Sequence, residues 1–240
     1  VIETGKLAEQ AGGAVTLRYG DTVIFCAATM AKNASPGVDF VPLTVEYEEK
    51  LYAAGRIPGS FFRREGRPAE SAILTSRVID RPLRPLFPKD LRNEVQVILM
   101  PFSHDQEHQV DMIGIVAAST ALMISDVPWA GPVAGVRIGL IDGELVVNPT
   151  ISEMENSTLD LRVAGTAEAI NMVECGAQEV DEATMLKAFD LAHDTIKVLT
   201  QFQIEIREKI GKAKSQYEAD TEDEALIADV TAQVYDQVRQ

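Results

Sequence analysis

The sequence predicts an α/β protein in which helices pack on a mixed sheet and an all-helical region begins near the C-terminal end. Three observations lead to this prediction. Apolar runs rich in Val, Ile and Thr recur through the first 175 residues, and short Gly-containing turns separate several of them. Stretches with helical spacing interrupt these runs, which is typical of a mixed sheet covered by helices. After residue 180 only helical spacing remains.

The composition is that of a globular protein large enough to bury a core. The chain has 240 residues, 46% of them hydrophobic, and a mean hydropathy of −0.01. It contains no apolar run long enough to cross a membrane, and we expect no signal peptide. Cys26 and Cys175 lie far apart in apolar runs, so we expect buried free thiols and a reducing compartment.

Both ends of the chain predict that it is part of a longer protein. Val1 is not a start methionine, and the first three residues have the character of a strand interior. Gln240 falls in the middle of a helical pattern.

Strand patterns fill the N-terminal end. Residues 13–18 and 22–30 flank Tyr19-Gly20-Asp21, which predicts a hairpin with a short turn. Residues 40–48 alternate as a third strand. Pro42 within that strand favours an edge position or a bulge, because proline cannot donate to a central ladder.

A helix is predicted over residues 69–80. Its spacing directs Ile73, Leu74 and Val78 toward the core. We expect Pro82 to end it, because the residue before a proline avoids the helical region.

The middle of the chain combines strands with one buried helix. Residues 94–101 alternate as a strand, and residues 112–125 are nearly all apolar or small, which predicts a helix buried on most sides. Asp142-Gly143 between two apolar runs is a strong hairpin signal. Two further strands are predicted at 158–164 and 170–175.

Helical spacing governs the C-terminal end. Asp181 is the expected N-cap and Gly211 the expected C-cap of one long helix. The polar residues 212–220 are expected to be a linker. Thr221 with Glu224 forms a capping-box pattern that starts another helix.

One window concentrates the positive charge of an acidic chain. The formal net charge is −15, yet nine of the 22 Lys and Arg residues lie between Tyr52 and Arg92, beside four acidic residues. Eight of those nine are Arg, whose planar fork of donors binds phosphate oxygens in pairs and stacks on bases. A localised anion site, not a basic coat over the whole surface, is therefore indicated.

Aromatic residues stand beside these arginines. Phe61 and Phe62 directly precede Arg63 and Arg64, and this interleaving is what a sequence-tolerant binder of single-stranded nucleic acid needs. The alternative is that the Phe pair packs inward while nearby acids pair with the arginines. Arg77 and Arg81 share a helix face if the helix reaches that far, and ion pairs with acids such as Asp80 remain the competing interpretation.

Other chemistries have weak signals. The phosphate-binding glycine loops and the G-x-S-x-G elbow are absent. His104 and His108 with Glu107 resemble metal ligands, but the polar residues around them favour a loop without a third ligand or a second shell. The acids near Asp160 suit Mg²⁺ by type, yet such acids on a surface turn are usually solvated. No metal site is therefore predicted in this chain.

Several motifs resemble the first core domain of the bacterial polynucleotide phosphorylase family. The motifs are YAAGRIPGSFFRREGRP at 52–68, IDRPLRPLFP at 79–88, NEVQV at 93–97, GPVA at 131–134, NPT at 148–150 and VAGT at 163–166. They extend over nearly the whole chain. The resemblance implies an RNase PH-like core over residues 1–213 and the start of an all-helical linker domain over 214–240.

The resemblance also implies a function. Members of this family degrade RNA from the 3′ end by phosphate attack, release nucleoside diphosphates, use Mg²⁺ or Mn²⁺, and form a ring-shaped homotrimer. They act in mRNA degradation in the bacterial cytoplasm, and an organelle is the other compartment left open. An RNA-degrading assembly is a further possible partner, and no membrane is expected.

In this family the second core carries the chemistry, and the present chain departs from the catalytic pattern. The Ser-rich phosphate turn corresponds to Gln109-Val110-Asp111, where an Asp repels phosphate. One catalytic acid corresponds to Asp160, but its partner position holds Met154, which does not ligate Mg²⁺. The resemblance therefore implies no catalytic residue and no metal here, with the metal bound elsewhere in the full enzyme.

By the same resemblance, this core binds single-stranded RNA in the central pore. The residues expected to bind RNA are Phe61, Phe62, Arg63, Arg64, Arg67, Arg77, Arg81 and Arg84. Two alternatives stay open: a self-sufficient phosphorolytic domain with a site built from Asp160, its neighbouring glutamates and Arg81, and a domain that only supplies trimer surface.

Overall fold

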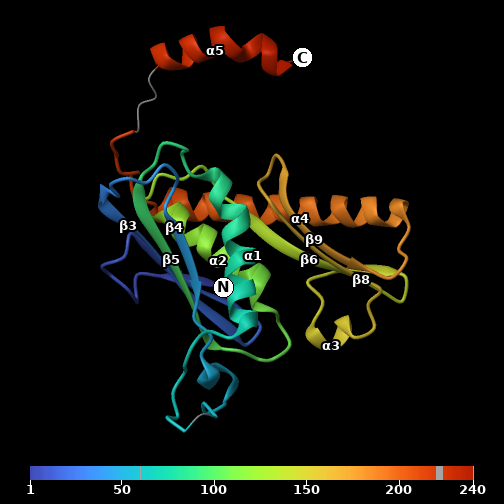
Figure 1. The fold of residues 1–240 in the computed structure, drawn as a ribbon. Coiled ribbons are helices and arrows are strands. Elements are labelled where there is room, and N and C mark those ends of the chain that lie inside the picture. Colours follow the sequence, from blue (N-terminus) through green and yellow to red (C-terminus); the bar gives the residue numbers. More distant parts are fainter. Residues whose placement is uncertain (60, 220–223, 240) are drawn as a thin grey trace.

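The computed structural model describes residues 1–59, 61–219 and 224–239. Its core consists of two sheets and a buried helix, α2 (Val110–Ile124), which contacts strands of both (Figure 1). The predicted α/β class with packed helices is therefore confirmed.

The first sheet is mixed and has five strands in the order β1-β2-β3-β5-β4. The strands are β1 (Ile2–Thr4), β2 (Gly13–Tyr19), β3 (Thr22–Ala34), β4 (Leu43–Tyr47) and β5 (Asn93–Ser103). The predicted β2–β3 hairpin is confirmed, with Tyr19 opposite Thr22. Strand β4 runs parallel to β5 at the edge of the sheet, and Pro42 lies just before it, as its missing donor requires.

The second sheet is antiparallel, in the order β7-β6-β8-β9. Its strands are β6 (Ala134–Ile141), β7 (Glu144–Val147), β8 (Leu159–Gly165) and β9 (Ile170–Ala177). Asp142 and Gly143 have φ values of 51° and 83°, the left-handed pair that a type I′ turn requires. The predicted hairpin is therefore confirmed. The short helix α3 (Ile151–Met154) connects β7 to β8.

Helix α2 is buried along nearly its whole length, as predicted. Small residues let its neighbours approach: a Cβ on Gly114 would lie 2.8 Å from Cδ1 of Ile79. The Ser119 hydroxyl donates to Gln203 and accepts from the backbone N–H of Val133 at 2.9 Å. These bonds satisfy polar groups that would otherwise be costly to bury.

Helix α1 (Glu70–Leu83) differs from the prediction in its end and in its buried face. Pro82 lies inside its last turn, where the missing N–H removes only one intrahelical bond, and the chain continues into η2 (Arg84–Leu86). Ile73 and Leu74 are 50% and 55% exposed, so their predicted direction toward the core is wrong, although Val78 is buried. Packing against α2 and β4 selects the other face, whose buried residues are Ala72, Val78, Ile79, Pro82 and Leu83.

Helix α4 (Glu182–Ile210) covers the second sheet and α2 (Figure 1). Its N-cap is Asp181, whose carboxylate accepts from the Thr184 N–H at 2.9 Å, and Gly211 is its C-cap. The predicted limits of this helix are therefore confirmed.

The polar segment after α4, predicted as a linker, is bound to the core in its first half. The Lys214 ammonium donates to the carbonyls of Leu122 at 2.8 Å and Ser125 at 2.9 Å, at the C-terminal end of α2, where a positive charge is stabilising. The Tyr217 hydroxyl donates to Asp90 at 2.8 Å. These bonds fix the direction in which the chain leaves the domain.

Helix α5 (Glu224–Arg239) is confirmed as a helix and lies apart from the two sheets in Figure 1. The Thr221 of the predicted capping box lies outside the described residues. None of the helices within the described residues is long and apolar enough to span a membrane.

The two cysteines have different surroundings. Cys26 is a buried free thiol in β3, as predicted, and burial raises its pKa. Cys175 is a free thiol but is exposed, so the prediction that it is buried is wrong. Strand β9 is the edge of the second sheet, and Cys175 lies on a side of it that no other element buries.

Candidate nucleic-acid interface

The predicted Arg/Phe segment is a long loop between η1 (Leu51–Ala54) and α1. It lies at the end of the molecule opposite α5 and protrudes beyond the first sheet (Figure 1). Gly55 ends η1 with φ 68°, a left-handed conformation that glycine adopts without strain. Glu65 accepts a hydrogen bond from the Leu51 N–H at 3.3 Å, which ties the returning half of the loop to η1.

Both aromatic side chains of this loop point into solvent. Phe61 is 95% exposed and Phe62 is 74% exposed, so the alternative that the pair packs inward is wrong. Their rings contact each other edge to face with centroids 5.6 Å apart. Two neighbouring exposed Phe side chains form a surface that gains free energy when a flat apolar partner covers it.

The arginines of the loop are exposed and available. Among the described residues, none forms an ion pair with Arg63, Arg64 or Arg67. The Arg64 guanidinium lies 5.9 Å from the centroid of the Phe62 ring, within the range of a cation–π contact. Arg63 has φ 52°, an uncommon conformation for a residue with a side chain. We call residues Phe61 to Arg67 the arginine–phenylalanine loop.

The predicted arginines of α1 and η2 lie farther along the chain. Arg77 is exposed, and no ion pair joins it to another described residue. Arg81 forms an ion pair with Glu174 of β9. Arg84 binds Asp80 at 2.9 Å and the Leu43 carbonyl at 3.0 Å. Arg81 and Arg84 therefore form ion pairs, as the competing interpretation expected. Both residues lie at the end of α1 away from the loop.

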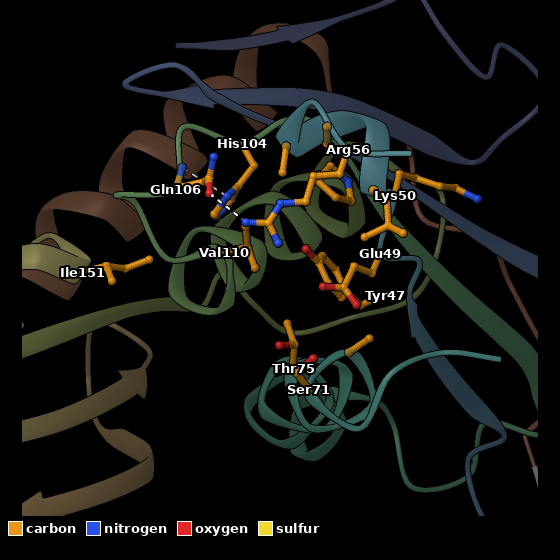
Figure 2. Close-up of a pocket in the computed structure, with 15 residues that line it drawn as sticks. Tyr47, Glu49, Lys50, Arg56, Ser71, Thr75, His104, Gln106, Val110 and Ile151 are labelled. Carbon is orange, nitrogen blue, oxygen red and sulfur yellow. Dashed lines mark hydrogen bonds between the residues drawn. The ribbon is translucent and has the colours of Figure 1, made fainter. Parts of the chain in front are cut away.

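A cavity of about 420 Å³ lies between the start of α1 and the start of α2 (Figure 2). Ser71 and Thr75 of α1 form one side, while Arg56 reaches across from the other and donates to Gln106 at 3.4 Å. Tyr47 lines the same space, and burial, with smaller contributions from Glu49 and Asp111, raises its pKa.

A second cavity, of about 550 Å³, lies beneath the arginine–phenylalanine loop. Arg64 and Arg67 line it on the loop side, and Glu49 lines both cavities. The two hollows therefore follow one another along the same face.

Asp160 and Asp111, which the resemblance aligns with catalytic positions, are held by arginines. Asp160 binds Arg137 through both carboxylate oxygens, each at 2.6 Å, and Arg137 has only 8% of its side chain exposed. The guanidinium of Arg162 lies 3.4 Å from Asp160 and 3.6 Å from Asp111. Glu174 is 3.7 Å from Arg162 and also pairs with Arg81. We call Arg81, Asp111, Arg137, Asp160, Arg162 and Glu174 the arginine–carboxylate network.

Sequence reasoning missed the partners in this network. Strand register brings them together: Arg137 lies opposite Arg162, and Arg162 lies opposite Glu174. The available signal was a charged residue inside each of two apolar strand runs, because an unpaired charge there is costly.

The acids beside Asp160 do not form a metal site. Glu153 caps α3 by reciprocal hydrogen bonds with Thr150, and Met154 contributes a thioether that suits Mg²⁺ poorly. The described residues hold no group of three or more His, Cys, Asp and Glu side chains placed to bind a metal. The residue types at this place therefore suit Mg²⁺ poorly.

The loop with the two histidines has a structural role. Asp105 contacts the His108 ring at 2.6 Å, and Glu107 accepts from the Ser152 hydroxyl at 2.6 Å, which joins this loop to α3. Burial alone would raise the pKa of Asp105. Hydrogen bonds from the His108 backbone and ring, the Glu107 N–H and the Thr22 hydroxyl outweigh that effect and hold the pKa of Asp105 well below its usual range.

Sequence comparison identifies the class of protein to which this fold and site belong. The profile of the 3′ exoribonuclease family, domain 1, matches residues 1–128, and the profile of domain 2 of the same family matches residues 131–195. The chain therefore belongs to the 3′ exoribonuclease family.

Individual relatives show which members of this family the chain is similar to. The polyribonucleotide nucleotidyltransferase of Lysinibacillus sphaericus is 54% identical over 232 residues, covering 97% of this chain and 33% of that protein. That of Thermomicrobium roseum is 52% identical over 239 residues, covering 100% of this chain and 30% of the relative. That of Geobacillus kaustophilus is 53% identical over 230 residues, covering 96% and 32%. The resemblance stated from the motifs is confirmed, and the chain spans about a third of the length of these relatives.

Proposed function

We propose that this chain is the RNA-binding, non-catalytic core of a phosphorolytic 3′-to-5′ exoribonuclease that acts in mRNA degradation. The whole enzyme shortens RNA by transferring the terminal nucleotide to inorganic phosphate and releasing a nucleoside diphosphate. The observation that carries the proposal is the arginine–phenylalanine loop, in which exposed aromatic rings and unpaired guanidinium groups protrude together.

Single-stranded RNA fits this loop by two complementary interactions. Phe61 and Phe62 offer faces on which bases stack, and stacking tolerates every sequence because every base has a π-face. Arg63, Arg64 and Arg67 offer donors for the phosphates that lie between those bases. The loop therefore binds a strand by its backbone and base faces and lets it slide.

The absence of catalysis in this core is supported by the arginine–carboxylate network. A metal-binding acid must offer free lone pairs, yet Asp160 directs both oxygens at Arg137. Asp111 places a carboxylate where the family's phosphate turn belongs, and it accepts from the Met112 N–H at 2.8 Å. The Mg²⁺ or Mn²⁺ of the full enzyme is accordingly bound outside residues 1–240.

The alternative of a self-sufficient phosphorolytic domain requires a catalytic site formed by Asp160, its neighbouring glutamates and Arg81. The ion pairs of Asp160 with Arg137 and of Arg81 with Glu174 weigh against it. The alternative of a purely structural domain leaves the exposed Phe pair without a role. We further infer a bacterial cytoplasmic homotrimer, in which three such loops raise the effective concentration of binding groups around one strand. Assembly with other RNA-degrading enzymes is part of the same proposal.

The division of the chain at residues 213 and 214 also remains our proposal. The core domain would end with α4, and α5 would begin the all-helical domain. The hydrogen bonds of Lys214 and Tyr217 attach the segment that follows α4 to the core.

The double substitution Arg63→Ala with Arg64→Ala tests the RNA-binding role. Affinity for a short oligouridine should fall, and the slope of log affinity against log salt should flatten by about 1.4, or about 0.7 for each lost phosphate contact. The matched control is Arg207→Ala with Lys209→Ala, which removes the same charge from the exposed end of α4. Equal affinity and salt slope in both double variants would refute an RNA-binding loop.

A phosphorolysis assay tests the non-catalytic role separately. The chain is incubated with oligouridine, phosphate and Mg²⁺, and the release of uridine diphosphate is measured. We expect binding without release. Release that Asp160→Asn abolishes would show that this core carries the chemistry itself.

A further inference from the structure

The side chains that line the cavity beneath the arginine–phenylalanine loop carry a balance of charges that binding of the RNA backbone does not explain. It measures about 550 Å³, enough for a nucleotide. Its charged lining residues balance, three of each sign: Glu48, Glu49, Glu65, Lys50, Arg64 and Arg67. A site for phosphate alone would carry a net positive charge.

The carboxylates of this cavity exclude the RNA backbone. Glu48 is neutralised by Lys50, so a phosphodiester that entered would meet the like charges of Glu49 and Glu65, whereas Arg63 on the outside of the loop offers it an exposed guanidinium. Lys50 is already paired with Glu48 at 2.7 Å, so it adds little attraction for a phosphate. The group that enters is therefore the uncharged part of the nucleotide, the base.

The remaining hydrogen-bonding groups form a mixed pattern. Glu65 uses one oxygen for the Leu51 N–H at 3.3 Å, and its second oxygen has no partner among the described residues. The same part of the chain provides no hydrogen bond to the Glu49 carboxylate or to the Arg67 guanidinium. The cavity thus combines carboxylate acceptors with the guanidinium donors of Arg64 and Arg67.

We propose that this cavity is a base-reading subsite that favours guanine, an inference that rests on the proposed RNA-binding function. Guanine presents the N1–H and the 2-amino group as adjacent donors, which suit a carboxylate of Glu49 or Glu65. Its N7 and O6 are adjacent acceptors, which suit the fork of Arg67 in the cavity lining, and the phosphates at this nucleotide are then left to Arg63 and Arg64. Uracil lacks the amino donor, cytosine lacks the pair of adjacent donors, and adenine lacks both paired edges. A stacked, sliding strand would therefore pause when a guanosine reaches the loop.

Binding of defined oligonucleotides tests this subsite. The probes are a ten-nucleotide oligouridine and the same strand with one central guanosine, adenosine or cytidine. We expect the guanosine strand to bind at least about five-fold tighter than oligouridine. Inosine, which lacks the 2-amino group, and 7-deazaguanosine, which lacks the N7 acceptor, should each lose part of that preference.

Two carboxylate variants locate the preference. Glu49→Gln and Glu65→Gln keep the size of the side chain but replace a charged acceptor by an amide. At least one of them should bring the ratio of guanosine to uridine affinity close to one. Glu94→Gln on β5 is the matched control, since Glu94 is exposed and lines neither cavity described above.

The outcomes separate the two proposals. Equal affinity of the wild-type chain for all four strands overturns the guanine subsite while leaving the RNA-binding loop intact. A preference that persists unchanged in both Glu variants overturns it as well. Failure of the RNA-binding function itself is seen differently, as oligouridine affinity that the Arg63→Ala with Arg64→Ala variant leaves unaltered.

Discussion

The arginine–phenylalanine loop and the arginine–carboxylate network use the same residue type for opposite purposes. In the loop, Arg63 and Arg67 are exposed and have no ion pair among the described residues. In the network, Arg137 is buried and held by both oxygens of Asp160. The N–H donors of an exposed guanidinium remain available to a ligand. A buried guanidinium needs a carboxylate partner, because both charges lose their hydration when they are removed from water.

This difference supports the proposal that the core binds RNA and has no chemistry of its own. The network holds acids and arginines that form ion pairs with one another. The loop carries the unsatisfied groups, and it protrudes on η1 and the start of α1, away from the second sheet (Figure 1). The comparison predicts that mutations in the two regions affect different properties.

The largest effect is expected from Arg137→Ala. Removing the nearly buried Arg137 side chain takes both short hydrogen bonds from Asp160 and leaves it only the 3.4 Å contact with Arg162, and we expect a loss of about 3 to 5 kcal/mol in the free energy of unfolding. Denaturant unfolding measures this change. Arg64→Ala in the loop is the control and should alter stability by less than about 0.5 kcal/mol. Equal losses in the two variants would contradict the division of roles.

The next largest effect is expected from Phe61→Ala with Phe62→Ala. Loss of two stacking faces should weaken oligouridine binding by about 2 to 4 kcal/mol, while the unfolding free energy stays the same, because both rings are exposed. Fluorescence anisotropy with a labelled oligonucleotide measures the affinity. Phe40→Ala, an exposed Phe outside the loop, is the control and should leave RNA affinity unchanged.

The smallest effect is expected from Arg81→Ala, which decides to which region this residue belongs. Its pair with Glu174 is half exposed, so stability should fall by less than about 1 kcal/mol. If Arg81 serves only the network, RNA affinity will be unchanged, whereas Arg77→Ala at the exposed middle of α1 will weaken it. A larger loss of RNA affinity for Arg81→Ala than for Arg77→Ala would move Arg81 into the binding site.

Much of the fold follows from local sequence. The Asp142-Gly143 turn, the buried helix α2 and the caps of α4 were all predicted, because each depends on a few neighbouring residues. The prediction that Pro82 ends α1 is wrong, because a proline in the last turn removes only one hydrogen bond and the helix continues to Leu83. The predicted burial of Ile73 and Leu74 is also wrong, because packing of α1 against α2 and β4 buries the other face of the helix.

The candidate site was predictable only in part. The charge and the aromatic residues of the loop marked its position along the chain, but not whether Phe61 and Phe62 face solvent. The partners of Arg81 and Arg137 lie 93 and 23 positions away, so only the assembled strands bring them together. The two cavities are likewise formed by segments that meet through the fold.

The sequence alone determined which residue types this protein places in its loop, its turns and its buried helix. Periodicity and turn chemistry act over a few residues, and they need no tertiary contact to be recognised. The tertiary structure decided which arginines are free and which are neutralised. That choice depends on strand register and burial, which set whether a carboxylate lies within 3 to 4 Å of each guanidinium.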